Sequence, residues 1–188
     1  MSPAVRYLGT SPAGDIIPTA KPRHGDERMD ISQITEYLFV GAHPEAADAP
    51  AIRELGIRLV ISMVGFRRPP AVFGVPPLRL LWFQTFDTVF IPIPLKTLQC
   101  GVEAAIPVIQ EGHAVLVFCM YGRHRSIAMA AAILIAMGYS ADEAMRMLET
   151  GRTAADPRAR HIRRQIERFE KRWHRLQGNT AEKGRGNV

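Results

Sequence analysis

The feature that most constrains the fold is the stretch VFCMYGRHRSIAMAAAIL, residues 117–134. It begins within AVLVFC (residues 114–119), a short apolar run typical of a strand buried in a parallel sheet. It ends within the apolar segment Ile127 to Met137, which is helical in character and is followed by Gly138, a common helix terminator. The loop between them holds one glycine and three basic residues. Ligands of open α/β sheets bind at the carboxyl ends of strands, so this order of elements predicts a ligand site.

The rest of the chain alternates strand-like and helix-like segments. Further strands are expected over residues 36–41, 57–64 and 78–84. Helices are expected over residues 44–55, 97–110 and 127–137, from the capping box at Ser140, and from Asp156-Pro157 to about Leu176. We expect Pro107 to kink or break the second of these helices. The pattern predicts an α/β fold with a mainly parallel central sheet flanked by helices.

The two ends of the chain differ from its middle. Residues 1–29 are rich in proline, glycine and charge without a sustained period, and residues 177–188 look the same, so both predict flexible arms around one domain over residues 30–176. The N-terminus has no apolar core of signal-peptide length, and no apolar run is long enough to span a bilayer. We therefore expect a cytoplasmic protein with reduced cysteines, Cys100 and Cys119.

The net charge of +6 favours anionic partners. Much of it lies in HIRRQIERFEKRWHR (residues 161–175), where apolar residues recur at helical spacing opposite a charged face. This predicts a packing helix, and no groove-reading motif accompanies it, so a nucleic-acid partner is not expected. The histidines and cysteines lack metal-ligand spacing, and we expect no metal or other cofactor.

The loop itself predicts phosphate chemistry. A helix starting near Arg125 directs its free N–H groups at the loop, and Gly122 permits a turn that places successive amides inward, which suits a tetrahedral oxyanion. The Arg125 guanidinium can hold two phosphate oxygens at once. The same positive field favours the thiolate of Cys119, a nucleophile beside the bound phosphate. Five residues separate Cys119 from Arg125.

CMYGRHRS resembles the loop Cys-x-x-Gly-x-x-Arg-Ser/Thr of the dual-specificity phosphatases, in the cysteine-dependent protein tyrosine phosphatase superfamily. The segment ITEYLFVGAHPEAADAPAIRELGIRLVISM is similar to the opening of that domain, and the likeness extends over about residues 30–172. The resemblance implies Cys119 as nucleophile, Arg125 as phosphate clamp, and Ser126 as the hydrogen-bond donor that helps the thiolate leave. The phosphate-binding residues would then be the loop residues Met120, Tyr121, Gly122, Arg123, His124 and Arg125.

One residue departs from that pattern. The family usually has a histidine directly before the cysteine, where this chain has Phe118. The resemblance gives that histidine a part in ordering the loop and lowering the cysteine pKa. Three outcomes stay open: a less activated cysteine, another polar group or water in its place, or a phenylalanine that simply packs in the core.

A general acid is also needed, because the leaving oxygen must be protonated. Between Gly56 and Ser140 the carboxyl residues are Asp87, Glu103 and Glu111. The two glutamates fall on or just after a predicted helix, whereas Asp87 lies in WFQTFDTVFIPIP, polar among aromatic residues. Its position upstream of Cys119 also resembles that of the family's general-acid aspartate. The competing interpretation is a turn or cap aspartate.

The sequence thus predicts hydrolysis of phosphate monoesters through a cysteinyl-phosphate intermediate, with protein phosphotyrosine, and also phosphoserine or phosphothreonine, as substrate. One alternative keeps the loop but takes an inositol phosphate, a phosphoinositide or an RNA 5′-phosphate, with Arg123 and His124 meeting the extra anionic group. Another is a phosphate-binding module with little or no turnover, because of Phe118. A sulfurtransferase is less favoured, since it leaves Asp87 and Ser126 unexplained.

Overall fold

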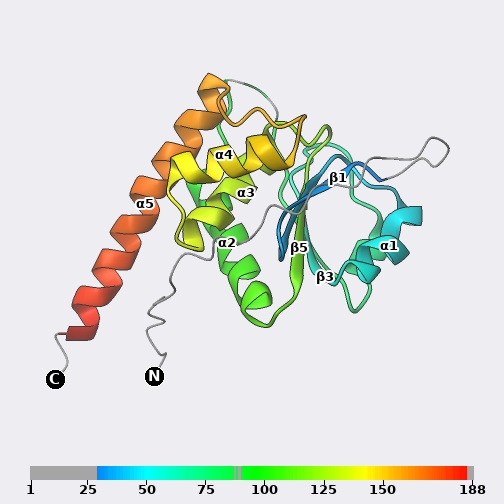
Figure 1. Cartoon of the computed structure of the whole chain (residues 1–188), viewed down its shortest axis with the longest axis horizontal. Helices are drawn as coiled ribbons and strands as arrows, with labels where there is room; N and C mark the ends of the chain where they lie inside the picture. Colours follow the sequence, from blue (N-terminus) through cyan, green and yellow to red (C-terminus); the bar gives the residue numbers. More distant parts are fainter. Residues whose placement is uncertain (1–28, 87, 89, 186–188) are drawn as a thin grey trace.

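A five-stranded sheet lies at the centre of the computed structural model, which describes residues 29–86, 88 and 90–185 (Figure 1). Its strands, in chain order, are β1 (Ile31–Thr35), β2 (Leu38–Gly41), β3 (Ile57–Ser62), β4 (Arg79–Trp82) and β5 (Ala114–Phe118). The spatial order is β1-β2-β5-β3-β4; β1 is antiparallel to β2, and the other pairs are parallel. The predicted mainly parallel sheet is confirmed, and β5 is its middle strand.

The middle strand β5 is apolar on both faces because both faces of the sheet are covered. Alternate residues along β5 enter two different clusters: Val117 packs with the large helical layer, whereas Leu116 and Phe118 pack with the smaller opposite layer. The sequence did not predict β1, a half-buried edge strand whose mixed residues give no strong pattern. Backbone pairing with β2 holds it in place.

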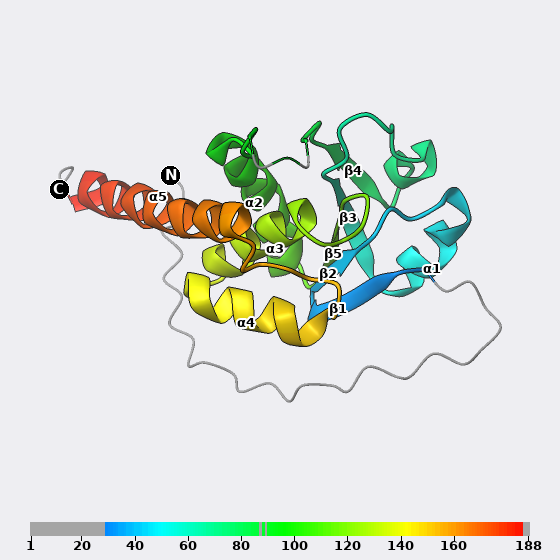
Figure 2. The same cartoon turned by 90° about the horizontal axis from the view of Figure 1, so that it is seen from above.

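Two unequal layers of helices cover the sheet (Figures 1 and 2). The larger holds α2 (Leu95–Gln110), α3 (Arg125–Ala136), α4 (Ala141–Gly151) and α5 (Arg160–Arg185). The smaller holds α1 (Ala49–Glu54) and the 3-10 turns η1 (Ala46–Asp48) and η2 (Ala71–Gly74). Helix α3 is buried along its length, because it lies between the sheet and the other helices of its layer. The Ser140 capping box is present at the start of α4.

Two helical predictions need correction. Helix α2 continues through Pro107, because this proline lies in the last helical turn and removes only one hydrogen bond before the helix ends at Gln110. Helix α5 runs to Arg185, past the predicted end at Leu176, so much of the predicted flexible tail 177–188 is helical. Adding residues to an existing helix costs far less than nucleating one, and no proline interrupts this segment.

The predicted arm of residues 1–29 lies outside the described residues, apart from Met29, which packs against the smaller core cluster. Among the described helices, none combines the length and the apolar character that crossing a membrane requires.

Candidate active site

The loop from Cys119 to Arg125 joins the middle strand β5 to the start of α3, near the centre of Figure 2. It lies between the ends of the neighbouring strands: the Cys119 N–H donates to the Gly41 carbonyl (3.4 Å), and the Met63 N–H donates to the Phe118 carbonyl (2.8 Å). The strand, loop and helix therefore meet as the sequence predicted, at the carboxyl edge of the parallel strands.

The backbone of this loop is held from outside. The carbonyl groups of all five residues from Met120 to His124 accept hydrogen bonds from groups beyond the loop. In chain order, the donors are His43 N (3.4 Å), Arg152 Nη2 (3.4 Å), Arg152 Nε (2.8 Å), Asp156 N (3.1 Å) and Ala128 N (2.9 Å). In a planar peptide unit the N–H points opposite to the C=O, so outward carbonyls turn the following N–H groups toward the centre. The loop is thus built as an anion-binding nest.

Gly122 is required at the turn of the nest. Its φ is +62°, a region that side-chain-bearing residues rarely adopt. A Cβ added there would lie 2.7 Å from the Gly41 carbonyl carbon and would collide with the Arg152 guanidinium. Only glycine therefore allows both the turn and the close approach of Arg152.

Cys119 is at the bottom of the nest, with its sulfur 3.3 Å from the Ser126 hydroxyl oxygen, which donates to it. Burial raises the pKa of the Cys119 thiol, but hydrogen bonds from the Ser126 hydroxyl and from the Ser126 and Arg123 backbone amides, together with the Arg125 charge, lower the pKa more, so the net shift is downward. Cys119 has no solvent-exposed surface.

Replacing Ser126 with alanine should raise the pKa of Cys119, because one of the hydrogen bonds that stabilises the thiolate is lost. Less thiolate is then present at acidic pH, so the rising limb of the pH–rate profile should move to higher pH. We expect turnover to fall about 10- to 100-fold, the value of one hydrogen bond to a charged group. Alkylation of Cys119 by iodoacetamide as a function of pH measures the shift directly. Ser126→Thr keeps the hydroxyl and is the control. If the rising limb of the pH–rate profile stayed at the same pH in Ser126→Ala, Ser126 would not be the residue that stabilises the thiolate.

The guanidinium of Arg125 is nearly buried at 7% exposure and is fixed by backbone carbonyls. Its Nη1 donates to the Met63 carbonyl at the end of β3 (2.9 Å) and to the Thr85 carbonyl after β4 (3.0 Å). The Thr85 hydroxyl donates to the same Met63 carbonyl (2.8 Å). Bidentate phosphate binding requires a guanidinium held in a fixed orientation, and the two carbonyl groups fix that orientation for Arg125.

A second arginine, Arg152, supports the loop from behind, and sequence reasoning missed it. It ends α4, is 2% exposed, and forms a two-pronged ion pair with Asp30 (2.8 and 2.9 Å) while donating to the Tyr121 and Gly122 carbonyls. In the sequence Asp30 and Arg152 are 122 residues apart, and no motif marks either of them. Only the folded chain brings them together under the nest.

Replacing Arg152 with methionine should lower the free energy of unfolding by about 3 kcal/mol, because a buried arginine with charged and carbonyl partners is lost. It should also raise KM for an aryl phosphate, since two loop carbonyls lose the donors that keep the nest open. Arg158→Met is the matched control: Arg158 follows the same helix but forms exposed ion pairs with Glu149 and Asp142. Equal stability and KM in the two variants, from urea unfolding and steady-state kinetics, would show that Arg152 does not support the loop.

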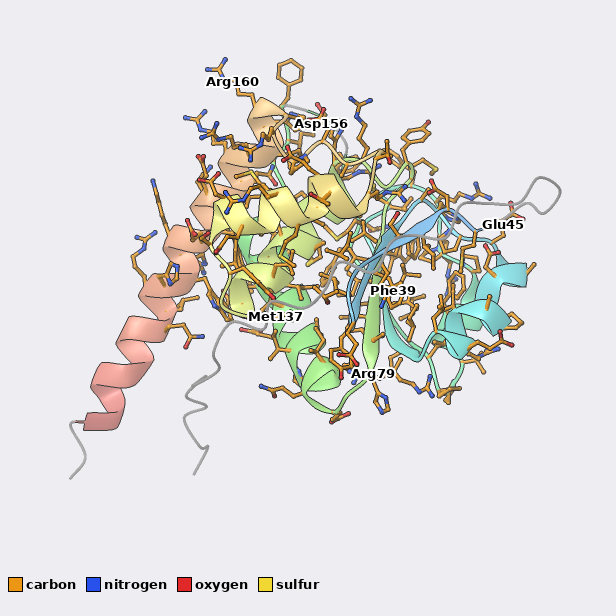
Figure 3. The ribbon with its side chains drawn as sticks, in the orientation of Figure 1. Phe39, Glu45, Arg79, Met137, Asp156 and Arg160 are labelled. Carbon is orange, nitrogen blue, oxygen red and sulfur yellow. The ribbon has the colours of Figure 1, made fainter. Side chains whose placement is uncertain are left out.

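The other two basic residues of the loop face an acidic residue. Arg123 pairs with Asp156 (3.2 Å), and His124 Nε2 lies 3.8 Å from the same carboxylate. Asp156, at the upper edge of Figure 3, lies in the segment between α4 and α5, and its carboxylate also accepts from the Ala159 N–H. Asp156 therefore lies beside both side chains predicted to meet a second anionic group, and its negative charge offsets part of their positive charge.

Phe118 packs in the core. It has no exposed surface and forms edge contacts with the rings of Phe73 (centroids 6.4 Å apart) and His43 (5.4 Å). Its side chain belongs to the smaller cluster, on the opposite face of the sheet from Cys119. The thiolate therefore depends on Ser126, the loop amides and Arg125 instead of a histidine at this position.

Asp87, the predicted general acid, lies outside the described residues, and its role stays a prediction. Its described neighbour Thr85 donates its hydroxyl hydrogen to the Met63 carbonyl and accepts from Arg125 through its own carbonyl. Among the described residues, no group of three histidine, cysteine or acidic side chains could hold a metal ion.

Comparisons with known proteins show which proteins share this fold and resemble this sequence. No family model matches the chain. Dual specificity phosphatase 28 of Mus musculus is 28% identical over 128 residues, which cover 68% of this chain and 76% of that protein. A mouse putative dual specificity phosphatase, solved as a complex with zinc tungstate, superposes with a TM-score of 0.71 at 23% identity, over 87% of this chain and 97% of that one. PTPMT1 in complex with PI(5)P superposes with a TM-score of 0.64 at 24% identity, over 76% and 95% of the two chains.

The shared fold is that of the dual-specificity phosphatases, as predicted. The chain is thus similar in sequence to Dual specificity phosphatase 28 and similar in fold to solved dual-specificity phosphatases, and it carries the loop CMYGRHRS.

Proposed function

We propose that this chain hydrolyses phosphate monoesters, with protein phosphotyrosine as its main substrate and phosphoserine or phosphothreonine as further ones, through a cysteinyl-phosphate intermediate. The observation that carries the proposal is the nest itself: outward carbonyls from Met120 to His124 above a cysteine whose pKa is lowered. The relatives named as dual-specificity phosphatases support the same reaction. Tungstate, present in the mouse structure, is a tetrahedral oxyanion like phosphate.

In the first step the Cys119 thiolate attacks phosphorus. The sulfur–phosphorus bond forms as the ester oxygen–phosphorus bond breaks, and the leaving oxygen takes a proton from the Asp87 carboxylic acid. Negative charge on the equatorial oxygens is stabilised by the inward N–H groups of the nest and by the Arg125 guanidinium, whose orientation is set by the Met63 and Thr85 carbonyls.

In the second step water attacks the cysteinyl phosphate. The Asp87 carboxylate accepts a proton from that water, the new oxygen–phosphorus bond forms, and the sulfur leaves as a thiolate. The Ser126 hydroxyl, 3.3 Å from the sulfur, stabilises the departing anion. Every group in the cycle returns to its starting protonation state.

A phosphoinositide or inositol phosphate is the second candidate, because PTPMT1, a neighbour in fold, was solved with PI(5)P. Such substrates carry several phosphates, and more cations are needed beside the nest to hold them. Here Arg123 and His124 face Asp156, so the loop offers less net charge to a second phosphate. This favours a substrate with one phosphate, as in a phosphorylated protein.

A binding module without turnover is less favoured. The binding-module alternative arose because Phe118 replaces a histidine that would lower the pKa of the cysteine. In this chain the Ser126 hydroxyl, the loop amides and Arg125 lower the pKa of Cys119 without that histidine. The packing of Phe118 against Phe73 gives it an ordinary core role.

The test is phosphate release by the unmutated protein from three substrates at equal concentration: a phosphotyrosine peptide, the matching phosphoserine peptide, and a polyphosphorylated inositol. We expect the phosphotyrosine peptide to give the highest kcat/KM. A higher kcat/KM for the inositol would move the assignment to the second candidate, and binding of the peptides without release would identify a binding module.

Replacing Asp87 with asparagine should lower turnover about 10²- to 10⁴-fold for substrates with poor leaving groups, because general-acid catalysis is lost. The loss should be much smaller for an aryl phosphate whose phenol is acidic and leaves without a proton. A series of aryl phosphates of graded phenol acidity measures this dependence. If turnover depended on phenol acidity equally in Asp87→Asn and in the wild type, another group would be the general acid. Glu103→Gln, on α2, is the matched control.

A further inference from the structure

Large apolar side chains are exposed in the loops that surround the nest. They form a rim cluster, whose members and exposed fractions are Phe66 (89%), Phe86 (40%), Phe90 (89%), Ile91 (54%) and Tyr121 (71%). Among the described residues seven large apolar side chains are exposed, and only Leu55 and Val75 lie outside the cluster. Single exposed apolar residues are ordinary, but five gathered around one site indicate a contact surface.

The topology of the sheet places the rim cluster at the catalytic edge. Phe66 follows β3, Phe86, Phe90 and Ile91 follow β4, and Tyr121 follows β5. These three strands are parallel, so their carboxyl ends share one edge of the sheet with Cys119. Leu55 precedes β3 and Val75 precedes β4, which places both at the opposite edge.

Three members of the rim cluster, Phe66, Phe86 and Tyr121, lie beside residues that hold the nest. The rings of Phe66 and Phe86 meet edge to face with centroids 5.0 Å apart. Beneath them Gly65 touches Thr85, where an added Cβ would lie 2.7 Å from the carbonyl oxygen, and that carbonyl accepts from Arg125. On the other side, the Tyr121 carbonyl accepts from Arg152 while its ring is exposed. These aromatic residues are therefore neighbours in the chain of the residues that hold the nest on both of its sides.

We propose that the rim cluster binds bulky apolar side chains next to the phosphorylated residue of a protein substrate, and so selects phosphorylated segments with apolar neighbours. This rests on the proposed function and names its substrate class more closely. Charge and apolar character are separated at the site: the phosphate meets Arg125 and the amides, and the flanking side chains meet aromatic surface. A phosphoinositide membrane fits less well, because Asp156 compensates the cations of the loop.

The test uses two phosphotyrosine peptides that differ only beside the phosphotyrosine, one with leucines and one with serines. Burial of even part of one leucine side chain against the rim predicts a kcat/KM ratio of about ten in favour of the leucine peptide. In the double variant Phe66→Ser/Phe90→Ser the ratio should fall close to one. The double variant Leu55→Ser/Val75→Ser, which removes exposed apolar groups from the opposite edge, should keep the ratio. All four positions are exposed, and thermal melting checks that both proteins are folded.

The outcomes separate this proposal from the proposed function. A wild-type ratio near one, or an unchanged ratio in Phe66→Ser/Phe90→Ser, overturns the rim proposal and leaves the phosphatase assignment standing. No turnover of either peptide overturns the phosphatase assignment. Co-sedimentation of the wild type with phosphatidylserine vesicles, lost in Phe66→Ser/Phe90→Ser, would assign the rim to a membrane. A wild-type dimer that becomes a monomer in that variant would assign the rim to self-association.

Discussion

Cys119→Ser is expected to abolish phosphate release from an aryl phosphate, with a loss of at least about 10³-fold in kcat. The serine hydroxyl is not ionised near neutral pH, and the amides and Arg125, which lower the pKa of the thiol, cannot bring an alcohol into the same range. The fold should be kept, since the two side chains differ little in size. Phosphate release measured under single-turnover and steady-state conditions gives the comparison.

Cys100→Ser is the control for this experiment. Cys100 is also a free thiol, but it is exposed on α2 and takes no part in the nest. Its replacement should leave kcat and KM at the wild-type values. Retained activity in Cys119→Ser, or a comparable loss in Cys100→Ser, would remove Cys119 from the role of nucleophile.

Arg125→Lys should lower kcat/KM about 10²- to 10³-fold, a loss nearly as large as that expected for Cys119→Ser. Lysine keeps the positive charge but has no planar fork, so it cannot bind the Met63 and Thr85 carbonyls and two phosphate oxygens together. Because these oxygens carry more charge in the transition state than in the ground state, kcat should fall more than KM rises. The segment carrying Thr85 should also become less protected against amide exchange.

Arg158→Lys is the matched control, because Arg158 forms exposed ion pairs outside the nest. We expect that variant to keep wild-type kinetics. If Arg125→Lys kept them too, charge alone would account for phosphate binding, and the carbonyl anchors of Arg125 would have no catalytic consequence.

Local patterns in the sequence predicted much of the fold and the centre of the site. The apolar run at 114–119 predicted the middle strand, because a parallel strand that is buried on both faces is apolar at every position. Gly122 predicted the turn, and its φ of +62° bears this out. The spacing of Cys119, Arg125 and Ser126 predicted a common site, and the structure brings the three together.

Long-range contacts account for what the sequence did not predict. Arg152 supports the loop through Asp30, and Asp30 is held near α4 by the pairing of β1 with β2 and the packing of β1 against α4. The last helix was predicted to begin at Asp156-Pro157, but α5 begins at Arg160, and Asp156 accepts from the Ala159 N–H in the turn before it. Its approach to Arg123 depends on where this turn lies in the folded chain. Phe118 differs from the histidine that usually precedes the cysteine in the phosphatase pattern. The structure accounts for the phenylalanine, because its side chain packs on the face of the sheet opposite to that of Cys119.

The most direct test of the central idea is to trap the intermediate. The unmutated protein is mixed with a ³²P-labelled phosphotyrosine peptide, quenched with acid within milliseconds, digested and analysed for the labelled residue. A nest that seats a phosphoryl group against the Cys119 sulfur predicts a transient label on Cys119, formed before phosphate is released and lost at the steady-state rate. Release of phosphate with no label on Cys119, or with the label on another residue, would contradict it.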